Sequence, residues 1–77
     1  MKQQLINNIE RQVVLSKIYG KGIINKVTLS DQDIYFDLSF NIDGITVNKK
    51  FSAVIAIEKN ILAFENEEIK FAYNQLM

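Results

Sequence analysis

Residues 34–51 carry the pattern that most constrains the fold of this 77-residue chain. Apolar side chains occupy every second position from Ile34 to Ile42, with polar side chains between them. This alternation is the period of a β-strand that has one buried face. Asp43-Gly44 follows, and a second alternating run begins at Ile45. Asp-Gly between two such runs predicts a β-hairpin, because a type I′ turn requires a positive φ at both central residues.

A two-residue loop also fixes which residues of the two strands face each other. The loop at Asp43-Gly44 predicts the cross-strand pairs Ile42–Ile45, Phe40–Val47 and Phe36–Phe51. One further pair does not fit an apolar face, because Lys49 falls opposite Leu38. We therefore expect a barrel rim or a β-bulge at that position.

The rest of the chain predicts shorter elements. Residues 2–11 have apolar side chains at helical spacing and are expected to form a short amphipathic helix. Residues 12–18 and 23–29 are rich in β-branched side chains and are expected to be strands, joined by a tight connection over 19–22. Residues 30–33 have the composition of a turn that leads into the central hairpin.

Two further segments follow the hairpin. Ser52 can cap a short helix over residues 53–57, although this apolar run is equally compatible with a strand. Residues 61–64 supply more core side chains. Asn66 is a good N-cap residue, and Glu67 and Glu68 would complement the dipole of a helix over 67–76. That helix places four apolar side chains on one face, namely Ile69, Ala72, Tyr73 and Leu76.

These elements predict one α+β domain over residues 1–77, with a helical segment in 1–12, antiparallel strands in 13–51 and helical segments in 52–77. The chain has too few residues for a sandwich. A small antiparallel bent sheet or an SH3-like barrel, with an N-terminal helical segment and a C-terminal helix, is expected instead. The chain contains no cysteine and no histidine, which argues against disulfides and structural zinc and favours a cytoplasmic setting. No signal-peptide pattern and no membrane-spanning run is found in the sequence.

A resemblance to a known module rests on the sequence Tyr19-Gly20-Lys21-Gly22-Ile23-Ile24, followed by the hairpin strands and by Lys49-Lys50-Phe51. Over residues 12–62 the chain resembles the small barrels of bacterial proteins, including the CarD-like barrel and the Tudor-like C-terminal barrel of UvrD. The resemblance implies a protein-binding or nucleic-acid-binding barrel without catalysis. It transfers no functional residue to this chain.

Composition and motifs also limit the function. General acid–base or nucleophilic catalysis lacks histidine and cysteine, and no serine has an evident base nearby. Gly20-Lys21-Gly22 precedes a strand instead of a helix, so it is expected to be a structural turn and not a phosphate loop. Asp31 and Asp33 are expected to form a turn, because the spacing of a calcium loop is missing. We therefore expect no enzyme activity, no metal, no cofactor and no small-molecule substrate.

Two kinds of binding surface remain. Six residues could form a basic patch for nucleic acid with one aromatic ring for stacking: Lys17, Tyr19, Lys21, Lys26, Lys49 and Lys50. The formal net charge of the chain is zero, however, whereas a dedicated nucleic-acid binder is usually basic. Apolar residues outside the predicted faces, namely Phe71, Ile24 and Val14, could instead contact a protein partner or a second copy, or be covered by the N-terminal helix. We expect a non-catalytic interaction module, with a protein partner or self-association ahead of nucleic acid and no membrane contact.

Overall fold

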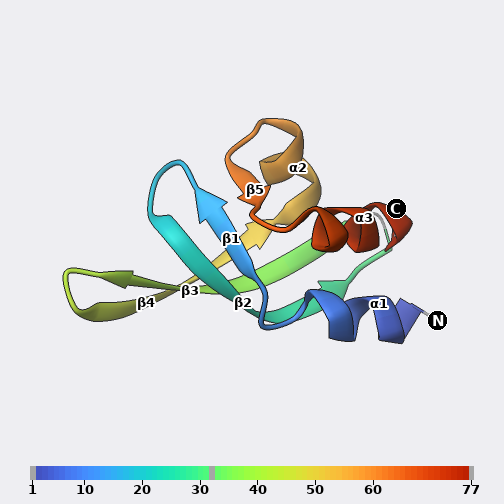
Figure 1. Ribbon diagram of the computed structural model, residues 1–77, viewed down its shortest axis with the longest axis horizontal. Coiled ribbons are helices and arrows are strands. Elements are labelled where there is room, and N and C mark those ends of the chain that lie inside the picture. The colour runs from blue at the N-terminus through green and yellow to red at the C-terminus, as the bar shows by residue number, and fades with distance from the viewer. Residues whose placement is uncertain (1, 32, 77) are drawn as a thin grey trace.

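The computed structural model describes residues 2–31 and 33–76, which form one five-stranded antiparallel sheet and three helices (Figure 1). In chain order the elements are α1 (Lys2–Ile9), β1 (Val13–Ser16), β2 (Gly20–Leu29), β3 (Ile34–Ile42), β4 (Ile45–Ser52), α2 (Ala53–Glu58), β5 (Leu62–Phe64) and α3 (Glu67–Leu76). The strand order is β4-β3-β2-β1-β5, so β4 and β5 are the two edges of an open sheet. The predicted α+β class is confirmed, and the sheet is bent and open, not closed into a barrel.

The central hairpin has the predicted turn and register. Asp43 and Gly44 have φ values of 53° and 82°, as a type I′ turn requires. The β3–β4 register is continuous from Tyr35–Ser52 to Ile42–Ile45 and the sheet is open, so the expectation of a barrel rim or a bulge at Lys49 is wrong. Lys49 is tolerated opposite Leu38 because β4 is an edge strand, where a long side chain can reach solvent.

The irregularity of the sheet lies in β2 instead. The pairing with β3 shifts between Ile24 and Lys26, which leaves Asn25 as the additional residue of a β-bulge. Residues 24 and 27 would face opposite sides of a regular strand, but the bulge allows both Ile24 and Val27 to be buried. The carboxylate of Glu10 accepts a hydrogen bond of 3.0 Å from the Val27 N–H beside the bulge. The bulge therefore bends the long strand that links the two halves of the sheet.

The N-terminal half differs from the prediction in its boundaries. α1 ends at Ile9, and the chain then turns through Arg11, which has a φ of 72°. β1 ends at Ser16 and β2 already begins at Gly20, so the tight turn covers 17–19 instead of 19–22. Gly22 lies inside β2, where the ring of Phe40 occupies the space that a Cβ would need.

The C-terminal third contains one element that the sequence did not predict. Residues 53–58 are helical, which settles the alternative left open for this run, and α3 begins and ends as predicted. Asn66 Oδ1 accepts a hydrogen bond of 2.8 Å from the Glu68 N–H, as expected of an N-cap. Leu62–Phe64, expected only to supply core, forms β5 and pairs with β1.

The buried side chains of the strands all lie on one face of the sheet, which we call the inner face. The helices bury residues against the same core, including Ile6 and Ile9 from α1 and Tyr73 from α3. Of the two alternatives for Val14 and Ile24, exposure to a partner or cover within the domain, the structure has the second: they are 1% and 0% exposed in the core to which α1 contributes. The other face, the outer face, has no helix of the described residues packed on its strands. None of the described helices is long and apolar enough to cross a membrane.

Candidate functional site

A tight turn after β1 determines where Tyr19 lies. Ser16 is buried, and its Oγ accepts hydrogen bonds of 3.1 Å from the backbone N–H groups of both Ile18 and Tyr19. Gly20 follows with a φ of 83°, a conformation that costs glycine little. The turn therefore directs the Tyr19 side chain toward the β3–β4 hairpin.

The Tyr19 ring packs on two phenylalanines of that hairpin. Its centroid lies 5.1 Å from that of Phe40 and 6.4 Å from that of Phe51, and the Phe40 and Phe51 centroids are 6.3 Å apart. Phe40 is fully buried, whereas Tyr19 and Phe51 are only half-buried. The cluster thus forms the end of the core, and Tyr19 and Phe51 are the members of the cluster that solvent reaches.

Two residues of β4 complete this open surface. Val47 pairs with Phe40 and Lys49 pairs with Leu38, so both side chains lie on the inner face beside Phe51. The Lys49 Nζ lies 5.5 Å from the centroid of the Tyr19 ring, a cation–π contact. We call the surface formed by Tyr19, Val47, Lys49 and Phe51 the Tyr19 shelf. Its only polar side-chain groups are the Tyr19 hydroxyl and the Lys49 ammonium group, and it borders the outer edge of β4.

The lysines of the expected basic patch do not converge. Lys50 follows Lys49 in the strand and so faces the opposite side, where its Nζ lies 5.3 Å from the Tyr35 ring centroid. Lys26 of β2 and Lys50 of β4 are the two cross-strand neighbours of Asp37 in β3. Of the six residues expected to bind nucleic acid, the structure brings only Tyr19 and Lys49 into the contact described above.

Two of the six remain. Lys17 is exposed in the β1–β2 turn, and Lys21 Nζ lies 3.8 Å from Glu65 Oε1 in an exposed ion pair. Nucleic-acid binding by the six residues stays a prediction.

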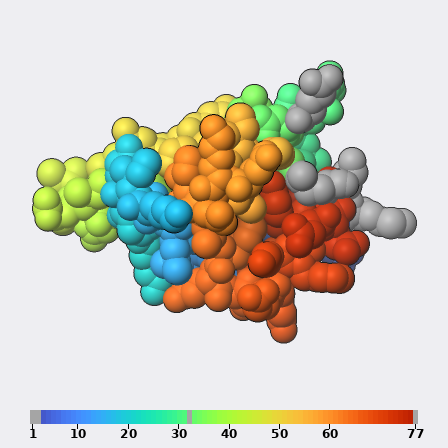
Figure 2. All heavy atoms as spheres, turned by 90° about the horizontal axis from the view of Figure 1, so that it is seen from above, coloured from blue at the N-terminus to red at the C-terminus, as the bar shows by residue number. Residues whose placement is uncertain are grey.

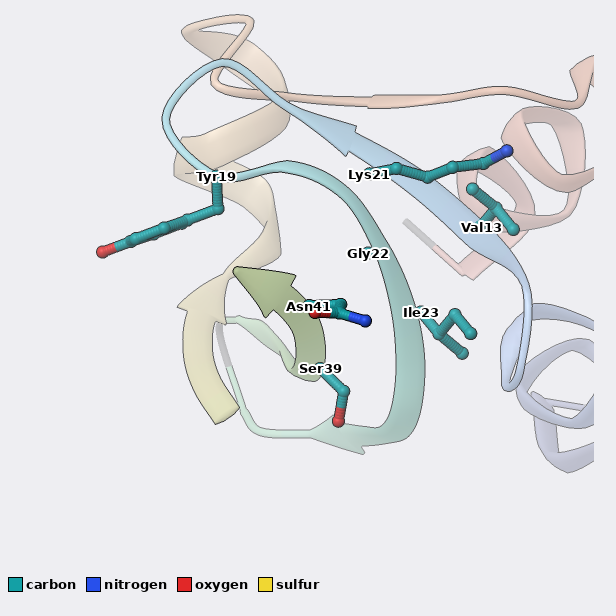
Figure 3. A pocket seen from close by; sticks show the side chains of 7 residues that line it. All are labelled: Val13, Tyr19, Lys21, Gly22, Ile23, Ser39 and Asn41. Carbon is teal, nitrogen blue, oxygen red and sulfur yellow. The ribbon is translucent and has the colours of Figure 1, made fainter. Parts of the chain in front are cut away.

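The outer face carries apolar side chains that the sequence did not single out. Leu15 and Ile23 are 43% and 47% exposed. Ile23 also lines a shallow hollow of about 370 Å³, together with Val13, Tyr19, Lys21, Gly22, Ser39 and Asn41. Figure 3 shows Val13, Lys21 and Ile23 pointing to one side of β2, while Tyr19 points the other way. Sequence alternation could have flagged Leu15 and Ile23 only if the register of β1 and β2 had been known.

Hydrogen bonds and burial shift the pKa values of two side chains, Asp33 and Tyr73. Asp33 accepts a hydrogen bond of 2.6 Å from the Ser52 hydroxyl and one of 2.7 Å from the Ile34 N–H. These bonds hold the pKa of Asp33 below its ordinary value, with the Ser52 hydroxyl as the larger cause. Burial, together with the negative charge of Asp33, raises the pKa of Tyr73. Among residues 2–31 and 33–76, no three acidic side chains gather where they could hold a metal ion.

Comparisons of this chain with protein-family models, with curated proteins and with solved structures found no match.

Proposed function

We propose that this chain is a non-catalytic interaction module that binds a protein partner at the Tyr19 shelf. The observation that carries the proposal is the position of Tyr19. A buried serine holds the turn that presents the ring, and the ring rests on Phe40 and Phe51 at the end of the core that remains open. Half-buried aromatic side chains on a rigid support are typical anchors of protein interfaces.

The surroundings of the shelf support a protein partner. Ile18 and Ile45, 67% and 66% exposed, lie in the β1–β2 turn and next to the hairpin turn. An apolar surface at the end of a small domain is a feature of protein contact sites. The SH3-like resemblance implies binding as well, although the five-stranded antiparallel sheet is open and not closed into a barrel.

Nucleic-acid binding is the alternative. The position of Tyr19 beside Lys49 favours it, because a base could stack on the ring. The remaining lysines lie elsewhere, however. Lys21 forms an ion pair with Glu65, and Lys26 lies directly opposite Asp37. The formal net charge of zero also gives no long-range attraction to phosphates. Binding of a short oligonucleotide that weakens with salt and is lost in a Lys21→Glu/Lys50→Glu variant would favour this alternative.

Self-association through the outer face is a second form of protein contact. Leu15 and Ile23 would supply its apolar centre. Light scattering at high protein concentration tests it, because a monomer would count against this form and would leave the Tyr19 shelf as the proposed contact.

The experiment for the proposed function is a comparative pull-down from a lysate of the source cells. The baits are the unaltered chain, a Tyr19→Ala variant and a Phe71→Ala control. Phe71, which the sequence also offers as a partner contact, is 66% exposed on α3, at the end of the molecule opposite the hairpin, so its removal tests whether that ring binds the partner instead (Figure 1).

The proposal predicts a protein that the unaltered and Phe71→Ala baits retain and the Tyr19→Ala bait loses. Circular dichroism must show that all three baits are folded. If every retained protein is equally abundant on the Tyr19→Ala bait, the shelf is not the binding site.

A further inference from the structure

The outer edge of β4 has no partner strand among the described residues. β4 is eight residues long and pairs with β3 on one side only, whereas the other edge strand, β5, has three residues. Figure 2 shows the hairpin projecting beyond the rest of the molecule, so a second chain can approach this edge. A long edge of unpaired backbone groups is a template for an additional strand.

The register indicates which backbone groups face this edge. Ile42 and Ile45 flank the two-residue turn, so they form the first hydrogen-bonded pair of the ladder, and such pairs alternate along it. The N–H and C=O groups of Thr46, Asn48 and Lys50 therefore point away from β3. These three residues would exchange hydrogen bonds with an added strand.

The side chains beside the edge differ between the two faces. On the inner face an added strand would lie next to Val47, Lys49 and Phe51, which belong to the Tyr19 shelf. On the outer face it would lie next to Thr46, Asn48 and Lys50. β4 thus offers two apolar positions on the inner face and one ammonium group on each face, with Asp37 of β3 directly opposite Lys50, and β4 itself contains no acidic residue.

We propose that β4 accepts one strand of a partner protein, an extended segment with two adjacent acidic residues opposite Lys49 and Lys50 and apolar residues opposite Val47 and Phe51. Backbone hydrogen bonds supply the attraction in this mode of recognition, and alternate side chains supply the specificity. This inference rests on the proposed function and names the chemistry of its partner.

Charge decides between an acidic partner and a second copy of the chain. Two β4 strands side by side would bring four lysines into one ladder, and lysine on an edge strand is a common protection against such self-pairing. Opposite charges across a ladder stabilise it, whereas like charges oppose it. The two lysines therefore disfavour self-pairing and favour an acidic strand.

The probe is the acetylated and amidated peptide Thr-Val-Glu-Glu-Thr-Val-Thr, which places both glutamates opposite the lysines in an antiparallel alignment. The control peptide carries lysine in place of both glutamates. Amide-resolved NMR titration is expected to show shifts at Thr46, Asn48 and Lys50 with the glutamate peptide only. The affinity is expected to fall about tenfold when the salt is raised from about 50 to about 300 mM.

Two variants test the mechanism. Asn48→Pro removes an outward N–H and keeps the backbone hydrogen bonds between β3 and β4, although the bond that Asn48 Oδ1 accepts from Ser39 Oγ is lost. The variant is expected to fold, since proline is tolerated on an edge strand, and to abolish binding. Lys49→Glu/Lys50→Glu is expected to reverse the preference, so that it binds the lysine peptide about tenfold more tightly than the glutamate peptide. The second variant keeps the test decisive if the proline variant does not fold.

Three results would overturn the proposal: no shifts at millimolar peptide, equal binding of both peptides, or shifts confined to the outer face around Leu15 and Ile23. If the peptides fail while a protein is still lost specifically from the Tyr19→Ala bait, strand addition is wrong and binding at the shelf stands. If that loss is absent as well, both proposals fail.

Discussion

The packing of Phe40 on Gly22 supports Tyr19 and can be tested by a double-mutant cycle. A Cβ on Gly22 would lie 2.7 Å from Phe40 Cδ1, which is closer than real Cβ contacts allow. Phe40 is 1% exposed and belongs to the buried core, so we expect Gly22→Ala to act as an overpacking change. Such changes typically cost about 1–3 kcal/mol, and we expect a loss of about 1.5 kcal/mol in the free energy of unfolding.

The second change of the cycle is Phe40→Leu, which makes room for the new methyl group. Alone it is expected to cost about 1–2 kcal/mol, because it removes buried apolar surface. The double variant is expected to lose about 1 kcal/mol less than the sum of the two single changes. Urea unfolding followed by circular dichroism measures all four proteins. A loss of 1.5 kcal/mol would also lower the Tm of a domain of this size by about 6–12 °C.

Gly20→Ala is the matched control. No atom lies within 4 Å of a Cβ at this position, but its φ of 83° makes alanine strained. The change is expected to cost about 1 kcal/mol and to add to Phe40→Leu without coupling. The packing argument is refuted if Gly22→Ala is neutral, or if its cost simply adds to that of Phe40→Leu.

Three further predictions concern the core, the chain after α1 and the acid stability. Tyr73 Oη is buried and has no hydrogen-bond partner among the described residues, so Tyr73→Phe is expected to raise the free energy of unfolding by about 1 kcal/mol. Arg11 has a φ of 72°, so Arg11→Gly is expected to stabilise the chain by about 0.5–1 kcal/mol, measured by urea unfolding. The pKa of Asp33 is lowered in the folded state, so its contribution to stability is present above the ordinary aspartate pKa of about 3.9 and is lost as the pH falls through the folded pKa. Ser52→Ala, which removes the main cause, is expected to flatten this acid-side loss in urea midpoints measured between about pH 2 and pH 6.

Each of these predictions has a result that would contradict it. A destabilised Tyr73→Phe protein would mean that the hydroxyl has a hydrogen-bond partner. Arg11→Ala serves as the control for Arg11→Gly, and equal stability of the two variants would show that the positive φ costs nothing. If the urea midpoint of Ser52→Ala falls with decreasing pH as steeply as that of the unaltered chain, the Ser52 hydroxyl is not the cause of the lowered Asp33 pKa.

The elements that the sequence predicted correctly are those with local signals. The hairpin follows from Asp43-Gly44 and strict alternation, and α3 follows from Asn66 and one apolar face. β5 has only three residues, and its pairing with β1 is a contact between distant parts of the chain. The bulge at Asn25 likewise depends on which residues of β2 the core buries, and no local pattern encodes that choice.

The candidate site was predictable only in part, for the same reason. Tyr19 and Lys49 were singled out as an aromatic ring and a cation, and the structure brings them together. Among the apolar residues outside the predicted faces, Phe71 is exposed, as its position on the helix indicated. The sequence could not decide whether Val14 and Ile24 are buried, because β1 and β2 each contain consecutive apolar residues, so either set could face the core. The bulge in β2 and the packing of Phe40 on Gly22 determine which side chains face the core, and these include Val14 and Ile24. Their neighbours are left on the outer face.

Residue-resolved amide hydrogen exchange of β4, without and with the glutamate peptide, tests the central claim most directly. In the free chain, Thr46, Asn48 and Lys50 are expected to exchange fast, and the residues between them slowly, because only the latter donate to β3. The peptide is expected to slow exchange at these three residues and to leave Leu15 and Ile23 unchanged. Two results would contradict the account: slow exchange of Thr46, Asn48 and Lys50 already in the free chain, or slowing of exchange by the peptide around Leu15 and Ile23 instead of in β4.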